Sequence, residues 1–595
     1  MRRPQVRRPV RRPTPTPSRP KRPPRTVRLA DPRQRLHVSL VLVCVLLSLF
    51  AGRLVQLQGL DASTYVAVAG HDRLWSTALP AQRGPIRDRD GEPLARSADG
   101  YHVTADQTLV KNPAAYALQL DALLPADART IQRTLTGDKR FQYVAKNVTP
   151  RTWRAIDELD LPGLYAEPAS QRDYPAGAVA GNIIGFVGAE GHGLAGLELS
   201  MDSLLAGKDG EITCQLRAGG HCIPLGNGSR RAAVTGTGVQ LTIDRDVQWY
   251  AEQALAAQVA AARADAGNLV VMDTRTFEIV AMATAPSVDP NRPGASDDDD
   301  RGNRAVEEAY EPGSVFKPLT MAAVIEEGAA TPSTVLSVPD RVERSGEVIS
   351  DYYDHSVDQM TLAGILAKSS NVGTLLAAEQ IDKTAFRDHL VRFGLGAKPD
   401  LGLPGESAGR LPEDWADLTR DTIAFGQGVA VSTVQMASAY ATIANGGVRL
   451  PARLVRATID AEGRSSAAEP GPPVRVVSEQ TAAAVTLMME AVMGEDGTGR
   501  SATVEGYRVA GKTGTAQRVD PSCGCYQGYN SSFMGFAPAD DPRFVVTVSL
   551  LNPRNGNSGG ALAGPVFADV LGFTLARMGV APTGTEPPQV DLFAD

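Results

Sequence analysis

The chain has 595 residues, of which 43% are hydrophobic and 21% are charged, and this composition excludes a mostly disordered protein. Its formal net charge of −7 combines a strongly basic first segment with an acidic remainder. Five cysteines are too few for a disulfide-dense scaffold, and the seven scattered histidines form no HExxH motif. No CxxC pair is present either, so the sequence implies neither a metal site nor a cofactor.

The N-terminal segment is basic and leads into an apolar run. Residues 1–36 contain 13 Lys or Arg and nine Pro, a composition that cannot form a packed core. From Leu36 to Gly52 no residue is charged, and the apolar residues that follow extend the run to a length that spans a membrane. A cleaved signal peptide is the alternative, but small residues are missing at the expected cleavage site. We therefore expect a single-pass plasma-membrane anchor at residues 36–57.

The charges beside this anchor predict its orientation. Positive residues that flank a spanning helix stay on the cytoplasmic side, so the tail at residues 1–35 is expected there. Everything from about residue 58 onward, including any catalytic domain, is then extracytoplasmic. A basic arm can also bind nucleic acid, but directly before an apolar helix it is better explained as a topology signal that contacts anionic lipid. We expect no nucleic-acid partner.

The exported part begins with a region of short strands, helices and turns at residues 58–230. Beyond it, alternating apolar residues predict strands, and an Ala-rich stretch with helical periodicity predicts a long helix. The expected strands are Thr235–Asp244, a hairpin over Asn268–Pro286 and Phe544–Leu550, and the expected helices are Val247–Ala266 and Pro565–Gly579. This order of elements favours an α/β body around an antiparallel sheet at residues 231–580.

The first motif with chemical potential is Tyr310–Pro318, in which Ser314 and Lys317 stand three residues apart. A Pro-Gly pair predicts a turn before the serine, and Pro318 fits a helix only within its first turn. We therefore expect Ser314 at a helix N-terminus, with Lys317 one turn further on the same face. A serine hydroxyl becomes a nucleophile when a base takes its proton, and a lysine with a lowered pKa can do so. Alone, SxxK is common by chance.

A second motif, Lys368-Ser369-Ser370-Asn371, follows the predicted helical stretch Leu362–Ala367. Two residues apart on a loop, Ser369 and Asn371 could both face a cleft. There the hydroxyl would relay a proton and the amide would bind a substrate peptide bond. Taken alone, an SSN triplet is more often a helix cap or a turn.

The third motif is Gly511-Lys512-Thr513-Gly514-Thr515, which we expect on the edge of a strand. Lys512 and two hydroxyls suit a carboxylate, and backbone N–H groups can face a developing oxyanion. Counted from Gly506, the same stretch fits a P-loop, which requires an apolar strand before it and a helix after it. The preceding residues are polar, and glycines and a proline interrupt any following helix, so nucleotide binding is disfavoured.

In this order, SxxK, SxN and KTG together supply a nucleophile, a base, a proton relay and an anion site. With them the chain resembles the penicillin-binding proteins, in particular the class B, single-pass, monofunctional peptidoglycan D,D-transpeptidases. The resemblance extends from the anchor to about residue 575. Further motifs that carry it are Arg83–Ala95, Gly193–Glu198, Phe425–Gly428, Ala439–Gly447 and Gly535–Pro538.

The resemblance implies the fold and the domain order. It implies an α/β (α+β) architecture, with a serine penicillin-recognising transpeptidase domain whose central antiparallel sheet is flanked by helices. An elongated mixed α+β pedestal of the dimerisation type and a single transmembrane helix would precede it. The expected domains are a cytoplasmic tail at 1–35, the anchor at 36–57, the pedestal at 58–230, the transpeptidase domain at 231–580 and a C-terminal tail at 581–595.

The resemblance also implies catalytic roles. Ser314 would attack the penultimate D-alanine carbonyl of a stem pentapeptide and release the terminal D-alanine, with Lys317 as the base. Ser369 would pass the proton to the leaving amine, and Asn371 would bind the substrate amide. Lys512 would act beside them, and it is expected to help keep Lys317 neutral, because like charges that lie close together disfavour double protonation.

Substrate binding is implied for the third motif. Lys512, Thr513, Gly514 and Thr515 would hold the terminal carboxylate, and the backbone N–H groups of Ser314 and Thr515 would form the oxyanion hole. An amine from a neighbouring stem peptide would then take the acyl group and close a cross-link. The middle motif is SSN rather than SDN, and a deacylating glutamate is not evident, which disfavours a β-lactamase.

Several alternatives remain open within this resemblance. The long basic arm and the absence of extra C-terminal modules favour the cell-division (septal) member, whereas an elongation or sporulation paralogue is the nearest alternative. A non-catalytic penicillin-binding receptor or scaffold would keep the same fold. The partners implied are peptidoglycan stem peptides, β-lactams, the plasma membrane, a polytopic peptidoglycan glycosyltransferase and other division proteins.

Four cysteines lie in the exported part, where an oxidising environment permits disulfides. Cys214 and Cys222 are eight residues apart around two glycines, and Cys523 and Cys525 are separated by one glycine. We expect both pairs to form locally. A catalytic role is not expected for either pair.

Overall fold

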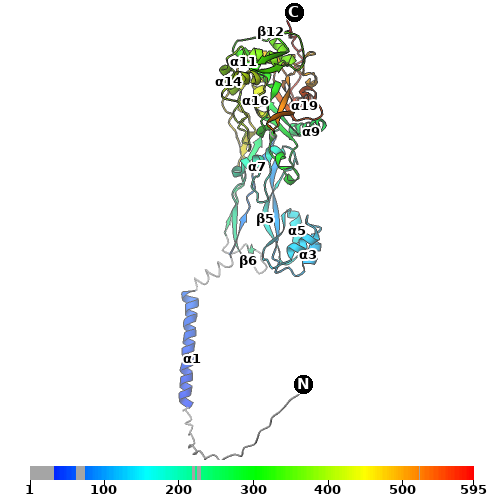
Figure 1. Cartoon of the computed structure of the whole chain (residues 1–595). Coiled ribbons are helices and arrows are strands. Elements are labelled where there is room, and N and C mark those ends of the chain that lie inside the picture. The colour runs from blue at the N-terminus through cyan, green and yellow to red at the C-terminus, as the bar shows by residue number, and fades with distance from the viewer. Residues whose placement is uncertain (1–31, 62–73, 217–221, 224–228, 521–522, 595) are drawn as a thin grey trace, which may run out of the picture.

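The computed structural model describes residues 32–61, 74–216, 222–223, 229–520 and 523–594. Helix α1 (Pro32–Val55) stands apart from the strands and helices that follow it (Figure 1), and none of its residues is buried. A π-turn at Gln56–Leu60 extends it, and together they are long and apolar enough to cross a membrane, by length and composition. The helix begins four residues before the predicted anchor, because Pro32 is favourable in a first helical turn. Most of the basic arm lies outside the described residues.

The pedestal is built on a long, seven-stranded sheet. Its strand order is β18-β17-β9-β2-β3-β4, with β5 also paired to β3. The strands are β2 (Ile86–Arg87), β3 (Pro93–Ala105), β4 (Gln142–Val148), β5 (Leu164–Asp173), β9 (Gly238–Leu241), β17 (Val455–Ile459) and β18 (Ser465–Ala467). Helices α3 (Pro113–Leu120), α4 (Ala128–Leu135) and α5 (Pro150–Asp157) contribute to a separate small core at one end of this sheet.

The strand predicted at Thr235–Asp244 forms, as β9, but it belongs to this long sheet and not to the central one. Its neighbour β2 runs parallel to it, with Ile86 opposite Val239, and β17 pairs antiparallel on the other side. Ile86 and Val239 are fully buried. Burial of alternating apolar side chains therefore explains why β9 forms, although its partner strands lie far away in the sequence.

Two motifs noted in the sequence, Arg83–Ala95 and Gly193–Glu198, contact each other in the pedestal. Arg83 and Arg172 both donate to the carboxylate of buried Glu198, and Arg83 also donates to Asp202 at 2.6 Å. Glu198 has no exposed side-chain surface, so its charge requires these two guanidinium partners. Glu198 lies on α7 (Gly196–Ser200) and Asp202 on α8 (Asp202–Leu205), and α6 (Gly181–Ile184) precedes them. A second sheet of the pedestal has the order β1 (Leu74–Leu79), β6 (Gly210–Leu216) and β7 (Cys222–Ile223), with β8 (Arg230–Arg231) also paired to β6.

A five-stranded antiparallel sheet forms the centre of the upper domain. Its order is β11 (Ile279–Ala285), β10 (Ala266–Asp273), β22 (Phe544–Leu551), β21 (Cys525–Ala537) and β20 (Ala510–Asp520). The predicted hairpin, the predicted strand at Phe544–Leu550 and the antiparallel sheet are thereby confirmed. Alternate residues of β10 enter two different apolar cores, so both faces of this sheet are covered.

Helices cover the two faces of this sheet (Figure 1). On one face lie α9 (Arg245–Ala262) and α19 (Gly564–Arg577), which confirm the two predicted helices. The other face is packed mainly by α16 (Thr433–Ala444). The remaining α-helices of this domain are α10 (Arg304–Glu307), α11 (Lys317–Glu326), α12 (Leu362–Lys368), α13 (Asn371–Ala378), α14 (Lys383–Arg392), α15 (Asp417–Ala424), α17 (Glu479–Ala491) and α18 (Gly559–Leu562).

Three short strand pairs complete the described fold. They are β12 (Val335–Val338) with β15 (Asp358–Thr361), β13 (Arg341–Arg344) with β14 (Glu347–Ser350), and β16 (Val448–Arg449) with β19 (Val474–Arg475). Short 3-10 turns lie at Pro293–Ala295, Asp298–Asp300, Gly313–Phe316 and Arg500–Ala502. Beyond α19 the chain continues along the surface to residue 594 and pairs with β15.

Candidate active site

The SxxK motif lies where a 3-10 turn, η4 (Gly313–Phe316), joins α11. The predicted helix start at Ser314 is therefore correct in position, although its first turn is 3-10 and not α. Pro318 lies in the first turn of α11, as predicted. Gly313 has a φ of +60°, and a Cβ there would lie 2.7 Å from the Cβ of Ala516 on β20. This glycine lets the half-buried Ser314 lie directly beside the KTG strand.

Lys317 is completely buried and points at the SxN motif. Its Nζ donates to the backbone oxygen of Ser369 at 2.5 Å and to Oδ1 of Asn371 at 2.8 Å, with Ser369 Oγ at 3.4 Å. Burial lowers the pKa of Lys317 to about 7, against the opposing influence of the negative charge on Asp351. An amine with this pKa is neutral in about half of the molecules at pH 7.

The SxN motif spans a break between two helices. Ser369 ends α12 in the left-handed conformation, with a φ of +61°, and Ser370 is the N-cap of α13. The prediction that Ser369 and Asn371 share a loop is wrong for Asn371, which is the first residue of α13. The reason is that the Ser370 hydroxyl accepts from the N–H of Gly373 at 2.8 Å and starts a new helix at once.

The KTG motif lies on β20, the edge strand of the central sheet, as predicted. Lys512 is completely buried, and its Nζ donates to Ser369 Oγ at 2.8 Å and to the backbone oxygen of Thr513 at 3.1 Å. A Cβ at Gly514 would lie 2.3 Å from Ser532 Oγ and 2.9 Å from Val315, so a glycine is required at this position of β20 for η4 to pack closely against the strand. The strand runs on to Asp520 without a helix, which excludes the P-loop alternative.

The two hydroxyls of this motif have partners along the cleft wall. Thr513 Oγ1 lies 2.8 Å from Thr498 Oγ1, and Thr515 Oγ1 accepts from the N–H of Gly559 at 3.2 Å. These hydrogen bonds fix both side chains, that of Thr513 against Thr498 and that of Thr515 against the start of α18.

Ser369 Oγ lies between the two buried amines, and this arrangement revises the expected electrostatics. We expected Lys512 to lower the pKa of Lys317, but burial is the dominant cause of that shift. The pKa of Lys512 is held well below its usual range by burial and by the positive charge of Lys317. Like-charge repulsion between the lysines therefore lowers the pKa of Lys512.

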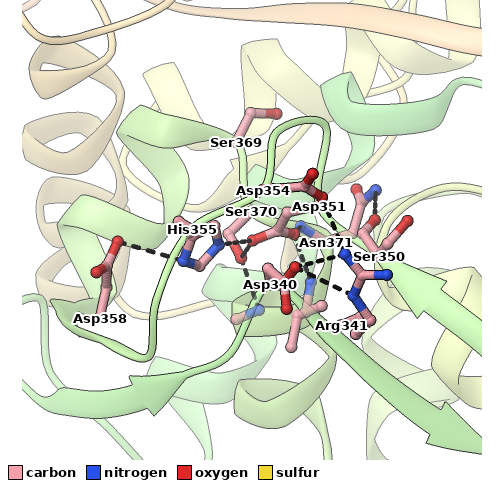
Figure 2. Close-up of polar contacts among 12 residues, drawn as sticks. Asp340, Arg341, Ser350, Asp351, Asp354, His355, Asp358, Ser369, Ser370 and Asn371 are labelled. Atoms are coloured by element: carbon pink, nitrogen blue, oxygen red, sulfur yellow. Dashed lines mark hydrogen bonds and ion pairs between the residues drawn. The ribbon is translucent and has the colours of Figure 1, made fainter.

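An acidic residue that the sequence analysis did not single out, Asp351, supports the SxN motif (Figure 2). One of its oxygens accepts from the N–H of Asn371 at 2.6 Å and from the N–H of Val372 at 3.0 Å. The other accepts from Ser370 Oγ at 2.6 Å and lies 3.1 Å from His355 Nε2. Asp351 stands at the positive N-terminus of α13, which favours its negative charge.

His355 extends this network from Asp351 to Asp358. Burial alone would lower its pKa, but the bond to Asp351 and the nearby charge of Asp358 outweigh burial, so the pKa of His355 is raised. Its Nδ1 lies 3.3 Å from the Asp358 carboxylate (Figure 2). Nothing in the sequence marks Asp351 and His355 except their spacing of four residues.

These motifs line one cleft of about 1000 Å³. Ser314, Ser369, Asn371, Thr513 and Thr515 all face it, whereas the two lysines lie beneath its floor. Its rim includes Val348, Tyr352 and Tyr526, all of them largely exposed, and the Phe425–Gly428 motif also borders it. In the described parts of the chain, no three His, Cys, Asp or Glu side chains are grouped as metal ligands would be.

Glu311 joins three segments at the mouth of the cleft. It accepts from the N–H of Gly428 at 2.9 Å and from the hydroxyl of Tyr526 at 3.1 Å. Tyr526 directly follows the Cys523–Cys525 disulfide, which confirms the local pairing predicted for these two cysteines. The side chains of the other predicted pair, Cys214 and Cys222, lie outside the described residues.

Two family models match the chain. The Penicillin binding protein transpeptidase domain matches residues 267–572, a range that contains the central sheet, except for its first residue, and all three motifs. The Penicillin-binding Protein dimerisation domain matches residues 78–241, a range that covers most of the pedestal strands.

Relatives with known names and structures agree with these models. The chain is 35% identical to penicillin-binding protein PbpB of Mycolicibacterium smegmatis, over 94% of this chain and 92% of that protein. It is 33% identical to peptidoglycan D,D-transpeptidase FtsI of Escherichia coli, over 91% and 92%. The crystal structure of penicillin-binding protein 3 from Mycobacterium tuberculosis complexed with aztreonam superposes with a TM-score of 0.68 at 33% identity, over 87% of this chain and all of that one. The chain therefore belongs to the class B penicillin-binding proteins, the serine-type D-Ala-D-Ala transpeptidases of peptidoglycan, and is similar to PbpB and FtsI.

Proposed function

We propose that Ser314 forms an acyl-enzyme with the penultimate D-alanine of a peptidoglycan stem peptide, and that this intermediate is passed to a neighbouring stem peptide. The observation that carries the proposal is the convergence of two buried lysines on one hydroxyl, Ser369 Oγ, at the wall of the cleft that Ser314 faces. Burying two amines is costly, and such strongly perturbed groups cluster at catalytic sites.

The acylation step is assigned as follows. Ser314 Oγ forms a bond to the D-alanine carbonyl carbon while its proton passes to the neutral Nζ of Lys317. The oxyanion is stabilised by the backbone N–H groups of Ser314 and Thr515. The proton then moves through Ser369 Oγ to the leaving amine, the C–N bond breaks, and the terminal D-alanine departs. An amine of the acceptor peptide reverses these transfers and closes the cross-link.

Recognition of the substrate is assigned to the KTG strand β20 and to Asn371. Lys512, Thr513 and Thr515 hold the terminal carboxylate, Gly514 allows the backbone to approach it, and Asn371 holds the peptide amide. Because burial and the positive charge of Lys317 hold the pKa of Lys512 low, a bound carboxylate raises it, and binding then takes up a proton. The same site accepts β-lactams, which fits the aztreonam complex of the Mycobacterium tuberculosis relative.

We further propose a septal role in cell division. Its support is the similarity to PbpB and FtsI along nearly the whole chain. The arm at residues 1–35 is then cytoplasmic, residues 36–57 are the anchor, and the pedestal at 58–230 and catalytic domain at 231–580 are extracytoplasmic. A polytopic glycosyltransferase and other division proteins are the partners that this role requires. An elongation or sporulation role is the alternative.

One experiment separates these functions. Full-length protein and its Ser314→Ala variant are expressed as fluorescent fusions in cells depleted of their own division transpeptidase. The proposal expects septal fluorescence for both proteins, but growth and labelling by a fluorescent penicillin only with Ser314 present. A scaffold or receptor would restore growth in both cases. Fluorescence spread along the growing side wall would instead support an elongation role.

A further inference from the structure

The last described residues of the chain pair with β15, the strand that leads into α12 and the SxN motif. Phe593 pairs antiparallel with Met360 of β15, flanked by two backbone hydrogen bonds. Thr361 N–H donates to Leu592 at 3.0 Å, and Ala594 N–H donates to Gln359 at 2.9 Å. The strand β12 pairs with β15 as well, so the tail adds one β-bridge to this two-stranded sheet, and the C-terminus lies near β12 in Figure 1.

This tail also contacts both ends of α12, the helix that carries Ser369 at its end. At the start, the N-cap hydroxyl of Thr361 accepts from Gly364 N–H at 2.9 Å and donates to the backbone oxygen of Asp591 at 2.7 Å. At the end, the ammonium of Lys368 lies 5.7 Å from the centre of the Phe593 ring. Lys368 lines the cleft and directly precedes Ser369.

The tail also contacts the segment that leads into the KTG strand. On leaving α19 it accepts from the hydroxyl of Tyr507 at Val580, at 2.6 Å, and Arg508 donates to Thr585 at 3.2 Å. Arg508 and Tyr507 lie two and three residues before Ala510, the first residue of the KTG strand β20, whereas the far end of the tail contacts α12. One short segment therefore spans from the lead-in of one catalytic motif to the helix of another.

Gly364 shows how closely the tail fits. A Cβ at this position would lie 1.9 Å from the backbone oxygen of Leu592, and its three nearest atoms all belong to that residue. Gly364 lies inside a helix, where alanine is normally the more stable residue. The close approach of the tail thus explains the glycine at this position.

We propose that the segment from Asp591 to Ala594 is a positioning element of the active site, which holds α12 so that Ser369 Oγ stays between Lys317 and Lys512. This rests on the proposed function of that site. The tail does not touch the substrate. It acts through α12, whose seven residues connect Thr361 at one cap to Ser369 at the other, and Leu592 and Phe593 are its positioning residues.

The test compares full-length, detergent-solubilised protein with a chain that stops after Val590, a residue that packs on the main core and is kept. The readout is the rate constant for acylation by a fluorescent penicillin, measured across pH. We expect a loss of about tenfold, because small displacements of catalytic groups have large effects on rate. The pH midpoint should also rise, since a looser α12 admits water to Lys317 and weakens the burial that lowers its pKa.

Gly364→Ala makes the test specific to the contact. In the full chain this substitution should reproduce the defect, and in the shortened chain it should add nothing, because Leu592 is absent. Phe593→Tyr should retain the rate, and Glu586→Gln, an exposed change elsewhere in the tail, is the matched control. Equal rates and midpoints for full and shortened chains would overturn the proposal, as would a Gly364→Ala defect of equal size in both. A full chain that penicillin never acylates would contradict the proposed function instead.

Discussion

Acylation of Ser314 should increase with pH through neutrality, because its base must be neutral to accept a proton. Burial brings the pKa of Lys317 to about 7. About a tenth of the molecules then carry a neutral lysine at pH 6, and about nine tenths do at pH 8, so the acylation rate should rise about tenfold between these values. Without burial, the ordinary pKa of a lysine would place this rise near pH 10.

The assay is stopped-flow acylation of the solubilised protein by a fluorescent penicillin between pH 5.5 and 9. Lys317→Ala is the control, and it should lose several orders of magnitude in rate and retain no inflection near pH 7. Circular dichroism would verify that the variant is folded. A wild-type rate that is flat from pH 6 to 8, or an inflection that survives in Lys317→Ala, would refute the assignment of Lys317 as the base.

The same shift links Lys317 to stability. Between about pH 7 and 10.5 the unfolded chain binds more protons at this lysine than the folded chain does, so folding becomes more favourable as pH rises. Relative to Lys317→Met, the free energy of unfolding of the wild type should therefore increase by about 1.4 kcal/mol per pH unit across this window. Urea unfolding of both proteins at pH 7.5 and 9 measures the difference, and a difference that does not change with pH would contradict a buried, neutralised lysine.

Two further substitutions test the surroundings of Ser369 and the mouth of the cleft. Lys512→Gln should weaken penicillin binding about tenfold. The pH midpoint of acylation should stay in place, since burial rather than Lys512 lowers the pKa of Lys317. A large shift in this midpoint would restore the role first expected for Lys512. In a double Cys523→Ser, Cys525→Ser variant the acylation rate should fall by a factor of less than ten, because the hairpin before Tyr526 loses a cross-link but keeps its strand pairing. Complete loss of acylation would show that the disulfide does more than fix a turn.

The sequence predicted the active-site motifs well because each is local. Pro318 restricts the helix start beside Ser314, and the KTG residues need a strand edge. The central sheet was also predictable in part, since its hairpin and its strand at Phe544–Leu550 carry continuous apolar runs that burial on two faces requires. Such patterns depend only on neighbouring residues.

Contacts between distant segments could not be predicted in the same way. The pairing of β9 with β2 follows from the arrangement of the pedestal, and no local pattern identifies a strand's partner. Asp351 is one acidic residue among 67 Asp and Glu, and only the fold brings it to the N-terminus of α13. The tail that pairs with β15 lies more than 200 residues from its partner, so no local pattern connects the two.

The measurement that tests the central claim most directly is the position of the penicillin adduct. Full-length protein is acylated with benzylpenicillin at pH 8, digested, and mapped by mass spectrometry. We expect one covalent adduct, on the peptide that contains Ser314, and none in Ser314→Ala under the same conditions. An adduct on Ser369 or on another serine, or undiminished labelling of Ser314→Ala, would contradict the assignment of the nucleophile.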